Sequence, residues 1–360
     1  MITNDNKNDA EDRKMIEAFR DSKRRDQYAN GEEKRLVDAY SLKKSIKIEG
    51  VKIEGYDFDS GVDYDKIIKS FASVGFQASH FSRAVEIVNG MIESKAKIFL
   101  GYTSNMVSSG LRDVIRYLVK HKKIGVCVTT AGGIEEDLMK CMGDFVLGDF
   151  RASGKELYDK GINRIGNIFV GNDLYVKLEE FIQPILQELY DEQRKTGKIF
   201  TPSDLVWKFG EKINNEKSIY YWAFRNKIPV YCPAITDGAI GGNIYYFKSK
   251  HPDFKLDIAE DCKKLNDETV GLDKSGVVIL GAGLVKHAIL EANIFRNGAD
   301  YAVYINTSQE FDGSDSGALP EEAISWGKLK AEVNSVKVFA DATIVFPLLV
   351  AETFAKTNRN

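Results

Sequence analysis

Lys328 lies near the end of a twenty-residue stretch, Phe311 to Lys330, that concentrates the side chains best able to do chemistry. The stretch reads FDGSDSGALPEEAISWGKLK, so two aspartates, two glutamates and Trp326 accompany the lysine. Its glycines and Pro320 predict a loop in the first half. Pro320 followed by two glutamates is typical of a helix start, where proline fits the first position and acids suit the helix dipole.

Two interpretations of this stretch are open. It could be a solvated acidic loop, since loops are generally polar. It could instead be a pocket for a multiply charged amine, in which carboxylates supply the counter-charge and Trp326 supplies a cation–π face. Lys328 held there could form a Schiff base. Neighbouring acids stabilise the ammonium form of a lysine, so nucleophilic attack would need burial or a bound cationic substrate beside it.

The composition narrows the class of protein to which these residues belong. The chain has 360 residues, 43% hydrophobic and 29% charged, which is enough for a large core. A net charge of −3 gives no electrostatic reason to expect nucleic acid. No apolar run approaches the roughly 20 residues of a membrane helix. The N-terminus lacks the apolar core of a signal peptide, so we expect a cytoplasmic protein.

The four cysteines and four histidines show no metal-ligand spacing. We therefore expect free, mostly buried thiols at Cys127, Cys141, Cys232 and Cys262, and no metal site.

The chain divides by composition into residues 1–50 and 51–360. The first part is rich in charge, and its predicted helix over 10–28 has only a thin apolar face, so we interpret it as a loosely docked arm or a cover for a site. In the second part short apolar runs alternate with helical segments such as 105–121, 172–195, 285–297 and 342–355. The runs are 98–102, 124–130, 144–148, 167–170, 228–232, 277–281, 301–305 and 336–340.

These runs are continuously apolar, which is typical of strands covered on both faces. Their alternation with helices predicts one large α/β domain with a doubly wound, mostly parallel and Rossmann-like sheet. In such sheets ligands bind beyond the carboxyl ends of the strands. Most of the predicted ends are rich in Gly, Ser, Thr or Asp, as is usual around nucleotides.

Three of these ends carry possible motifs. Gly281-Ala282-Gly283 suits either a dinucleotide turn or a plain tight turn, because Lys286 stands where a third glycine would be. Four polar residues, Ser104, Asn105, Ser108 and Ser109, open a helix, and simple capping explains only one of them. Thr129-Thr-Ala-Gly-Gly133 precedes Glu135 and Glu136, whose charge suits a ribose or a cationic substrate better than a pyrophosphate.

His287 follows the Gly281 turn at the start of a predicted helix. It could be structural, or it could be an acid/base group, since it lies at a strand's carboxyl end. Glu291 is four residues later and therefore on the same helix face, where it could orient the imidazole or bind an amine.

Taken together, these segments resemble the deoxyhypusine synthase family from Gly55 to Lys356. The stretches that carry the resemblance include GYDFDSGVDY, FLGYTSNMVSSGLRDVIRYLVKH, VTTAGGIEEDLMK, GINRIGN, YYWAFRNKIPVYCPAITDG, FRNGADYAVYINTSQEFDGSDSG, EEAISWGK and VFADATIVFPLLVAETFA. The resemblance implies an NAD-dependent enzyme that oxidises spermidine, holds its aminobutyl group as an imine on a lysine, and releases 1,3-diaminopropane. The group then passes to a lysine of the precursor of translation initiation factor 5A. It also implies a homotetramer, a dimer of dimers with active sites between subunits.

The resemblance assigns roles residue by residue. Lys328 would be the imine-forming nucleophile and His287 the acid/base group. The residues implied to bind the amine substrate are Glu135, Glu136, Gly242, His287, Glu291, Gly313, Ser314, Asp315, Glu322, Trp326 and Lys328. Those implied to bind NAD are Ser104, Asn105, Met106, Val107, Ser108, Thr130, Ala131, Gly132, Glu136, Asp237, Ala282, Thr307, Asp341 and Ala342.

The chain departs from the family at the amine site. Gly242 stands where the family normally has an aspartate that holds one end of spermidine, and Glu291 stands where it usually has asparagine. We hypothesise that Glu291 replaces the charge missing at Gly242. Two alternatives stay open here: transfer of the same group to putrescine, giving homospermidine, and a non-catalytic subunit that needs a paralogous partner. The retained Lys328, Trp326 and His287 argue against the second.

Overall fold

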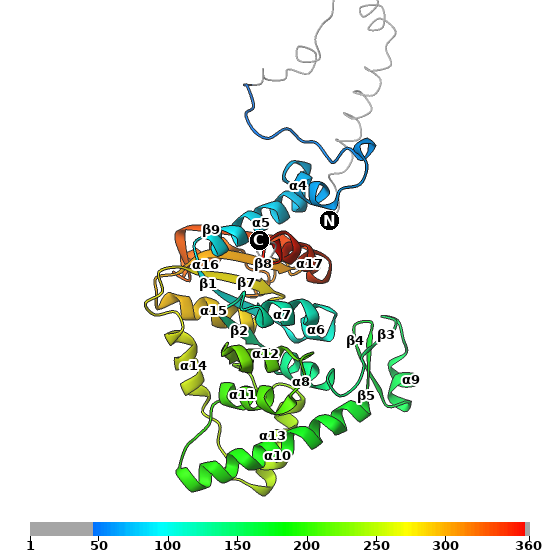
Figure 1. Cartoon of the computed structure of the whole chain (residues 1–360), viewed down its shortest axis with the longest axis vertical. Coiled ribbons are helices and arrows are strands. Elements are labelled where there is room, and N and C mark those ends of the chain that lie inside the picture. The colour runs from blue at the N-terminus through cyan, green and yellow to red at the C-terminus, as the bar shows by residue number, and fades with distance from the viewer. Residues whose placement is uncertain (1–45, 357–360) are drawn as a thin grey trace, which may run out of the picture. The chain divides into compact units, whose positions relative to one another are not determined.

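The computed structural model describes residues 46–356 (Figure 1), so most of the charged arm predicted over 1–50, including its helix, lies outside the described residues. Contacts divide the chain into Met1–Lys52 and Ile53–Asn360. Of the first unit, residues 46–52 are described, and they are exposed and belong to no helix or strand. The rest of the fold concerns the second unit.

The second unit is built on a six-stranded sheet in the order β6-β2-β1-β7-β8-β9, with every neighbouring pair parallel. The strands are β1 (Lys97–Tyr102), β2 (Val126–Thr129), β6 (Val230–Tyr231), β7 (Ser275–Leu280), β8 (Ala299–Asn306) and β9 (Leu329–Phe339). Strand order reverses between β1 and β7, as in doubly wound sheets. The prediction of an α/β fold with a mostly parallel sheet is confirmed.

Helices cover both faces of this sheet, because alternate strand residues join two different apolar clusters. Leu100 faces a cluster built with α5 (Phe76–Glu93), α7 (Leu111–Lys120) and α17 (Ala342–Glu352), whereas its neighbour Phe99 faces the cluster of α15 (Leu284–Ile294). α7 shows how a helix fits this layer, since its buried apolar residues recur at helical spacing. They are Leu111, Ile115, Leu118 and Val119.

Two of the predicted strands were assigned to the wrong sheet. Runs 144–148 and 167–170 contain β3 (Val146–Leu147) and β5 (Ile168–Gly171), which form a separate antiparallel sheet with β4 (Ile162–Ile165) in the order β3-β5-β4. This sheet lies beside α9 (Gly154–Asp159) in Figure 1. Val146 and Leu147 are exposed, so an apolar run did not mean burial on both faces here.

The predicted helix 105–121 is two helices, α6 (Ser104–Ser108) and α7, separated at Ser109 and Gly110. The segments 172–195, 285–297 and 342–355 correspond to α10 (Asn172–Thr196), α15 and α17. The other helices are η1 (Phe58–Ser60), α4 (Tyr64–Val74), α8 (Ala131–Met139), α11 (Pro202–Ile213), α12 (Ile219–Asn226), α13 (Ala239–Lys250), α14 (Ile258–Asp267) and α16 (Pro320–Ser325). Among the described residues no helix is long and apolar enough to cross a bilayer.

Candidate active site

Lys328 lies at the junction of α16 and β9. Its amide donates to the carbonyl of Ala323 (3.0 Å), and its carbonyl accepts from Ala299 at the start of β8 (3.1 Å). Gly327 has a φ of 70°, a left-handed conformation that lets the chain leave the helix and enter the strand. Lys328 is 8% exposed. The lysine is therefore fixed by backbone contacts at its base and buried along its stem.

The amine of Lys328 is surrounded by the three side chains that the sequence associated with it. Nζ lies 3.1 Å from His287 Nε2 and 3.3 Å from Glu291 Oε2. It also lies 5.6 Å from the ring centroid of Trp326. His287 and Glu291 occupy successive turns of α15, so one helix face presents both groups to the lysine.

A buried lysine, Lys286, fastens the acidic loop beside this cluster. Its side chain is 1% exposed, and its Nζ donates to the carbonyls of Asp315 and Ala318, the latter at 2.9 Å. Burial lowers the pKa of Lys286, and the carboxylates of Asp315 and Glu322 oppose that shift. Both carboxylates thus lie within electrostatic reach of one lysine. Asp315 Oδ2 is itself buried without a hydrogen-bond donor among the described residues.

Lys337 on β9 holds the same loop from the other side. Its Nζ donates to the carbonyls of Ser308 (2.6 Å) and Gly317 (2.7 Å). Sequence reasoning missed both anchoring lysines. Lys286 itself was the signal that could have indicated this role. It is a long cationic residue in the first turn after a glycine-rich loop, at the position where a dinucleotide turn would carry glycine.

The residues predicted to bind a cofactor gather at the carboxyl edge of the sheet, each following a strand. Those directly after a strand or opening the next helix are Ser104, Asn105, Met106, Val107, Ser108, Thr130, Ala131, Gly132, Ala282, Thr307, Asp341 and Ala342. Asp237 follows β6 at a longer interval. The amide of Ser104 donates to Thr130 Oγ1 (3.0 Å), which joins the starts of α6 and α8.

This edge has hydrogen-bond donors for a nucleotide. A Cβ at Gly281 would lie 2.4 Å from Thr103 Oγ1, so only glycine allows the β7 turn to approach β1 so closely. Helices α8 and α15 begin at Thr130 and Gly283 without a side-chain cap, which leaves first-turn amides for an anionic ligand. The edge therefore fits a dinucleotide in donor chemistry.

Glu136 sits at this edge as a buried carboxyl group. It is 7% exposed and accepts from Ser108 Oγ. Burial raises the pKa of Glu136 to about 7, although the Ser108 hydrogen bond opposes the shift. Lys140 completes the arrangement, since its Nζ donates to the carbonyls of Val107, Ser108 and Ser109 at 2.6–2.9 Å and so caps α6.

Glu135, the neighbour of Glu136, points to a different element. Its Oε2 accepts from the amide of Ile240 (2.9 Å) at the start of α13. Burial raises the pKa of Glu135, and the backbone hydrogen bonds of Ile240 and Ala239 oppose this. Its carboxylate is thus engaged in holding α13, and a role in binding an amine stays a prediction.

Gly242 lies in the first turn of α13, where an added Cβ would meet nothing within 4 Å. Within the described residues no hydrogen bond or ion pair connects Gly242, Asp237 or Glu136 to Lys328. The predicted amine-binding residues therefore form two groups within one chain, one around Lys328 and one around Glu136.

Two cavities open beside the start of α14. The first, here the α14–α15 groove, has a volume of about 300 Å³. It is lined by Pro202, Tyr231, Cys232, Pro233, Ile258, Asp261, Cys262, Leu265, Asn266, Leu284, His287, Ala288 and Glu291.

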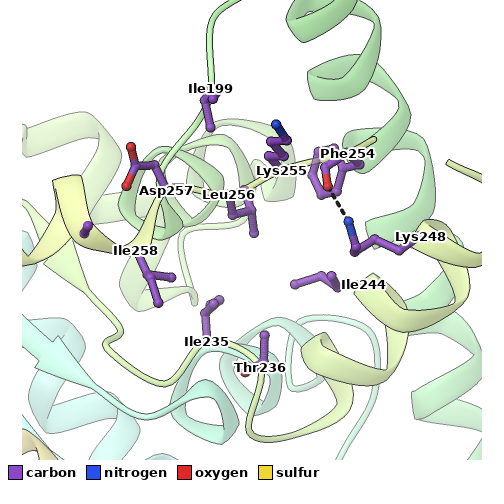
Figure 2. Close-up of a pocket in the computed structure, with 11 residues that line it drawn as sticks. Ile199, Ile235, Thr236, Ile244, Lys248, Phe254, Lys255, Leu256, Asp257 and Ile258 are labelled. Carbon is purple, nitrogen blue, oxygen red and sulfur yellow. Dashed lines mark hydrogen bonds between the residues drawn. The ribbon is translucent and has the colours of Figure 1, made fainter. Parts of the chain in front are cut away.

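The second cavity, here the α13–α14 hollow, has a volume of about 500 Å³ and is shown in Figure 2. It lies between Ile235 and Thr236, α13, and the segment that leads into α14, with Lys248 reaching the carbonyl of Phe254 (2.6 Å). Ile258 lines both cavities.

All four cysteines are free, as expected. Cys127 and Cys232 are buried, whereas Cys141 is partly exposed and Cys262 is exposed, so the prediction of mostly buried thiols holds for only half of them.

Comparison with known proteins gives a consistent result. Residues 66–353 match the family model described as deoxyhypusine synthase. The chain is 50% identical over 342 residues to deoxyhypusine synthase of Senecio vernalis, covering 87% of this chain and 92% of that protein. It is 49% identical over 348 residues to the Arabidopsis thaliana deoxyhypusine synthase, covering 89% and 95%.

A solved structure agrees with the sequence matches. It is a crystal structure of an Entamoeba histolytica protein provisionally assigned as a deoxyhypusine synthase. It superposes with a TM-score of 0.62 and 35% sequence identity, covering 84% of this chain and 97% of that one.

Proposed function

Because this chain belongs to the deoxyhypusine synthase family, we propose that it transfers the 4-aminobutyl group of spermidine to a lysine of the translation initiation factor 5A precursor. The reaction uses NAD, releases 1,3-diaminopropane and takes place in the cytoplasm. The observation that carries the proposal is the buried amine of Lys328 between His287, Glu291 and Trp326.

Lys328 is the nucleophile in this proposal. His287 Nε2, at 3.1 Å, accepts a proton from Nζ and leaves a lone pair to attack the oxidised carbon of the donor. The carbon–nitrogen bond to 1,3-diaminopropane breaks, and the two protons of the neutral lysine amine pass in turn to that leaving amine. Trp326 and the carboxylates of Asp315 and Glu322 hold the donor's ammonium groups. Gly313 and Ser314 line the slot, in a loop that Lys286 anchors at Asp315 and Ala318.

The carboxyl edge of the sheet holds the cofactor in a Rossmann-like manner. NAD held there would supply the hydride acceptor for the oxidation of spermidine and the hydride donor for the reduction of the product imine. The uncapped first-turn amides of α8 and α15 would hold its phosphates. Ser104, Asn105 and Ser108 of α6 and Asp341 at the cap of α17 would supply hydroxyl, amide and carboxylate groups to it, and Glu136 would lie beside Ser108.

A complete site needs two copies of the chain. Lys328 and Glu136 belong to groups that no described contact joins within one chain, and Trp326 and Glu291 are exposed. A partner that places its Glu136 group against the Lys328 group would cover them and enclose the amine. This arrangement favours a homotetramer, a dimer of dimers with shared sites.

Glu291 supplies the carboxylate that Gly242 lacks. Its carboxylate lies 3.3 Å from Lys328 Nζ, which supports a role at the reacting end of the slot. The relatives described above carry the deoxyhypusine synthase name, so the comparisons do not favour transfer to putrescine. The presence of Lys328 and His287 in contact likewise supports an active subunit.

An imine trap tests the proposal directly. The purified chain is incubated with NAD and spermidine labelled in its butyl group, then reduced with borohydride, and the label is mapped by peptide mass. We expect label on Lys328 that moves to the factor's lysine when the factor is added. Label that moves only to added putrescine, or no label on Lys328 with any acceptor, contradicts the proposal.

A further inference from the structure

The α14–α15 groove reaches the two side chains that hold the amine of Lys328. His287 and Glu291 contact Lys328 Nζ at 3.1 and 3.3 Å, and both also line the groove. A molecule in the groove therefore lies one residue away from the nucleophile. The groove and Lys328 are connected through one face of α15, because His287 and Glu291 both lie on that face.

The groove suits an aliphatic chain that ends in an amine. Its walls are largely apolar, with Ile258, Leu265, Leu284 and Ala288 from α14 and α15. No lysine or arginine is among its lining residues. A long methylene stem would contact the walls and replace water there.

The charge within the groove lies at one end. Asp261 is 7% exposed and already accepts from the amide and hydroxyl of Ser203, so it has little capacity for a further cation. Glu291 has a side chain that is 49% exposed. An ammonium group in the groove would therefore be drawn toward Glu291, and so toward Lys328.

The reaction needs two approaches to Lys328. Under the proposed function, on which this inference rests, the aminobutyl group that stays on Lys328 has its ammonium against Trp326, Asp315 and Glu322, and Glu291 is freed when 1,3-diaminopropane leaves. The acceptor must then reach the carbon held on Lys328 without displacing the remaining aminobutyl group. We propose that the α14–α15 groove receives the side chain of the acceptor lysine, whose four methylenes lie on the apolar walls and whose amine lies at His287 and Glu291.

The exchange balances without an added reactant. The acceptor nitrogen bonds to the imine carbon on Lys328, and the bond between that carbon and Lys328 Nζ breaks. The two protons lost by the neutral acceptor amine pass in turn to Lys328 Nζ through His287 Nε2. No electrons are gained or lost in this step, and the imine is then on the acceptor.

Two positions on α14 offer a matched test. Cys262 is exposed and lines the groove, whereas Ala259, one turn earlier, is exposed and lines the α13–α14 hollow. Cys262→Trp fills the groove and Ala259→Trp fills the hollow. We expect Cys262→Trp to raise the KM for the factor 5A precursor by about tenfold or more, and Ala259→Trp to change it by less than about twofold.

The first half-reaction separates this inference from the proposed function. Borohydride labelling of Lys328 from spermidine should be the same in wild type, Cys262→Trp and Ala259→Trp. If the wild type itself is not labelled, the proposed function fails and this inference falls with it. If Cys262→Trp alone loses the label while keeping the wild-type circular dichroism spectrum, the groove serves the donor and the inference is wrong.

A chemical modification avoids any effect of substitution on folding. Among the described cysteines Cys262 is the exposed one, so methyl methanethiosulfonate or a bulkier alkyl thiosulfonate can modify it in the folded enzyme. We expect the KM for the precursor, and for n-butylamine as a lysine side-chain probe, to rise with the size of the added group and to return after reduction. An unchanged KM, or an equal rise in the Ala259→Trp and Cys262→Trp enzymes, would overturn the assignment.

Discussion

Glu291→Gln is the sharpest test of how this chain binds its amine, because it removes one charge and keeps the shape of the side chain. Glu291 Oε2 lies 3.3 Å from Lys328 Nζ. At that distance two unit charges attract by about 5 kcal/mol with an effective dielectric constant of about 20. The Glu291 side chain is 49% exposed, so solvent reduces the attraction available to a bound ammonium to about 1–2 kcal/mol.

This energy corresponds to an increase of about 5- to 30-fold in the KM for spermidine. The measurement is steady-state kinetics with NAD and the factor precursor held at saturation. Glu321→Gln on α16 is the matched control, since it also removes one exposed carboxylate from the neighbourhood of the acidic loop. An unchanged KM in Glu291→Gln, or an equal rise in Glu321→Gln, would refute the reasoning.

A second substitution tests whether a carboxylate at position 242 can replace the one removed from Glu291. An added side chain at Gly242 meets nothing within 4 Å, and an aspartate in the first turn of α13 suits the helix dipole. Gly242→Asp in the Glu291→Gln background should therefore recover most of the affinity for spermidine. If the double variant binds no better than Glu291→Gln, then Glu291 does not stand in for a carboxylate at position 242.

Three further outcomes are expected. Lys328→Arg should abolish borohydride trapping while the chain still binds NAD, and label elsewhere in the chain would contradict the assigned nucleophile. The free energy of unfolding of the ligand-free protein should fall by roughly 2–3 kcal/mol as pH rises from about 4.5 to about 7, because the pKa of Glu136 in the folded protein is raised to about 7. Urea unfolding of Glu136→Gln should show no such fall with pH. Lys286→Met should lower the free energy of unfolding by about 1–3 kcal/mol, because it leaves two carbonyls unpaired, and it should also raise the KM for spermidine. A lower stability with an unchanged KM would show that the loop does not take part in binding spermidine.

Local rules predicted the parts of the site that depend on spacing within one element. His287 and Glu291 meet Lys328 together because residues four apart share a helix face. The continuous apolar runs likewise identified the central strands, whose burial on both faces leaves a clear signal. The same pattern led to the wrong prediction that Val146 and Leu147 belong to the central sheet, because a short apolar run does not indicate which strand it will pair with.

The features that sequence reasoning missed depend on which distant segments meet. Glu135 and Glu136 are consecutive, yet one holds α13 and the other faces α6, since adjacent residues on a helix point about 100° apart. Lys286 and Lys337 bind carbonyls of the loop after β8, and carbonyls carry no sequence signature. The α14–α15 groove needs residues from Pro202 to Glu291 and could not be foreseen from any one of them.

The way in which the loop is anchored bears on how such an enzyme can change its substrate. Lys286 and Lys337 hold the loop chiefly through main-chain oxygens, which every residue possesses. Apart from Gly313, with a φ of 71°, and Gly317, where an added Cβ would lie 1.6 Å from the carbonyl oxygen of Gln309, side chains between Ser308 and Ala318 can therefore be exchanged without releasing the backbone that carries them. Mutational drift or laboratory selection could vary the charges offered to an amine at low risk to folding, with the two lysines as the fixed frame.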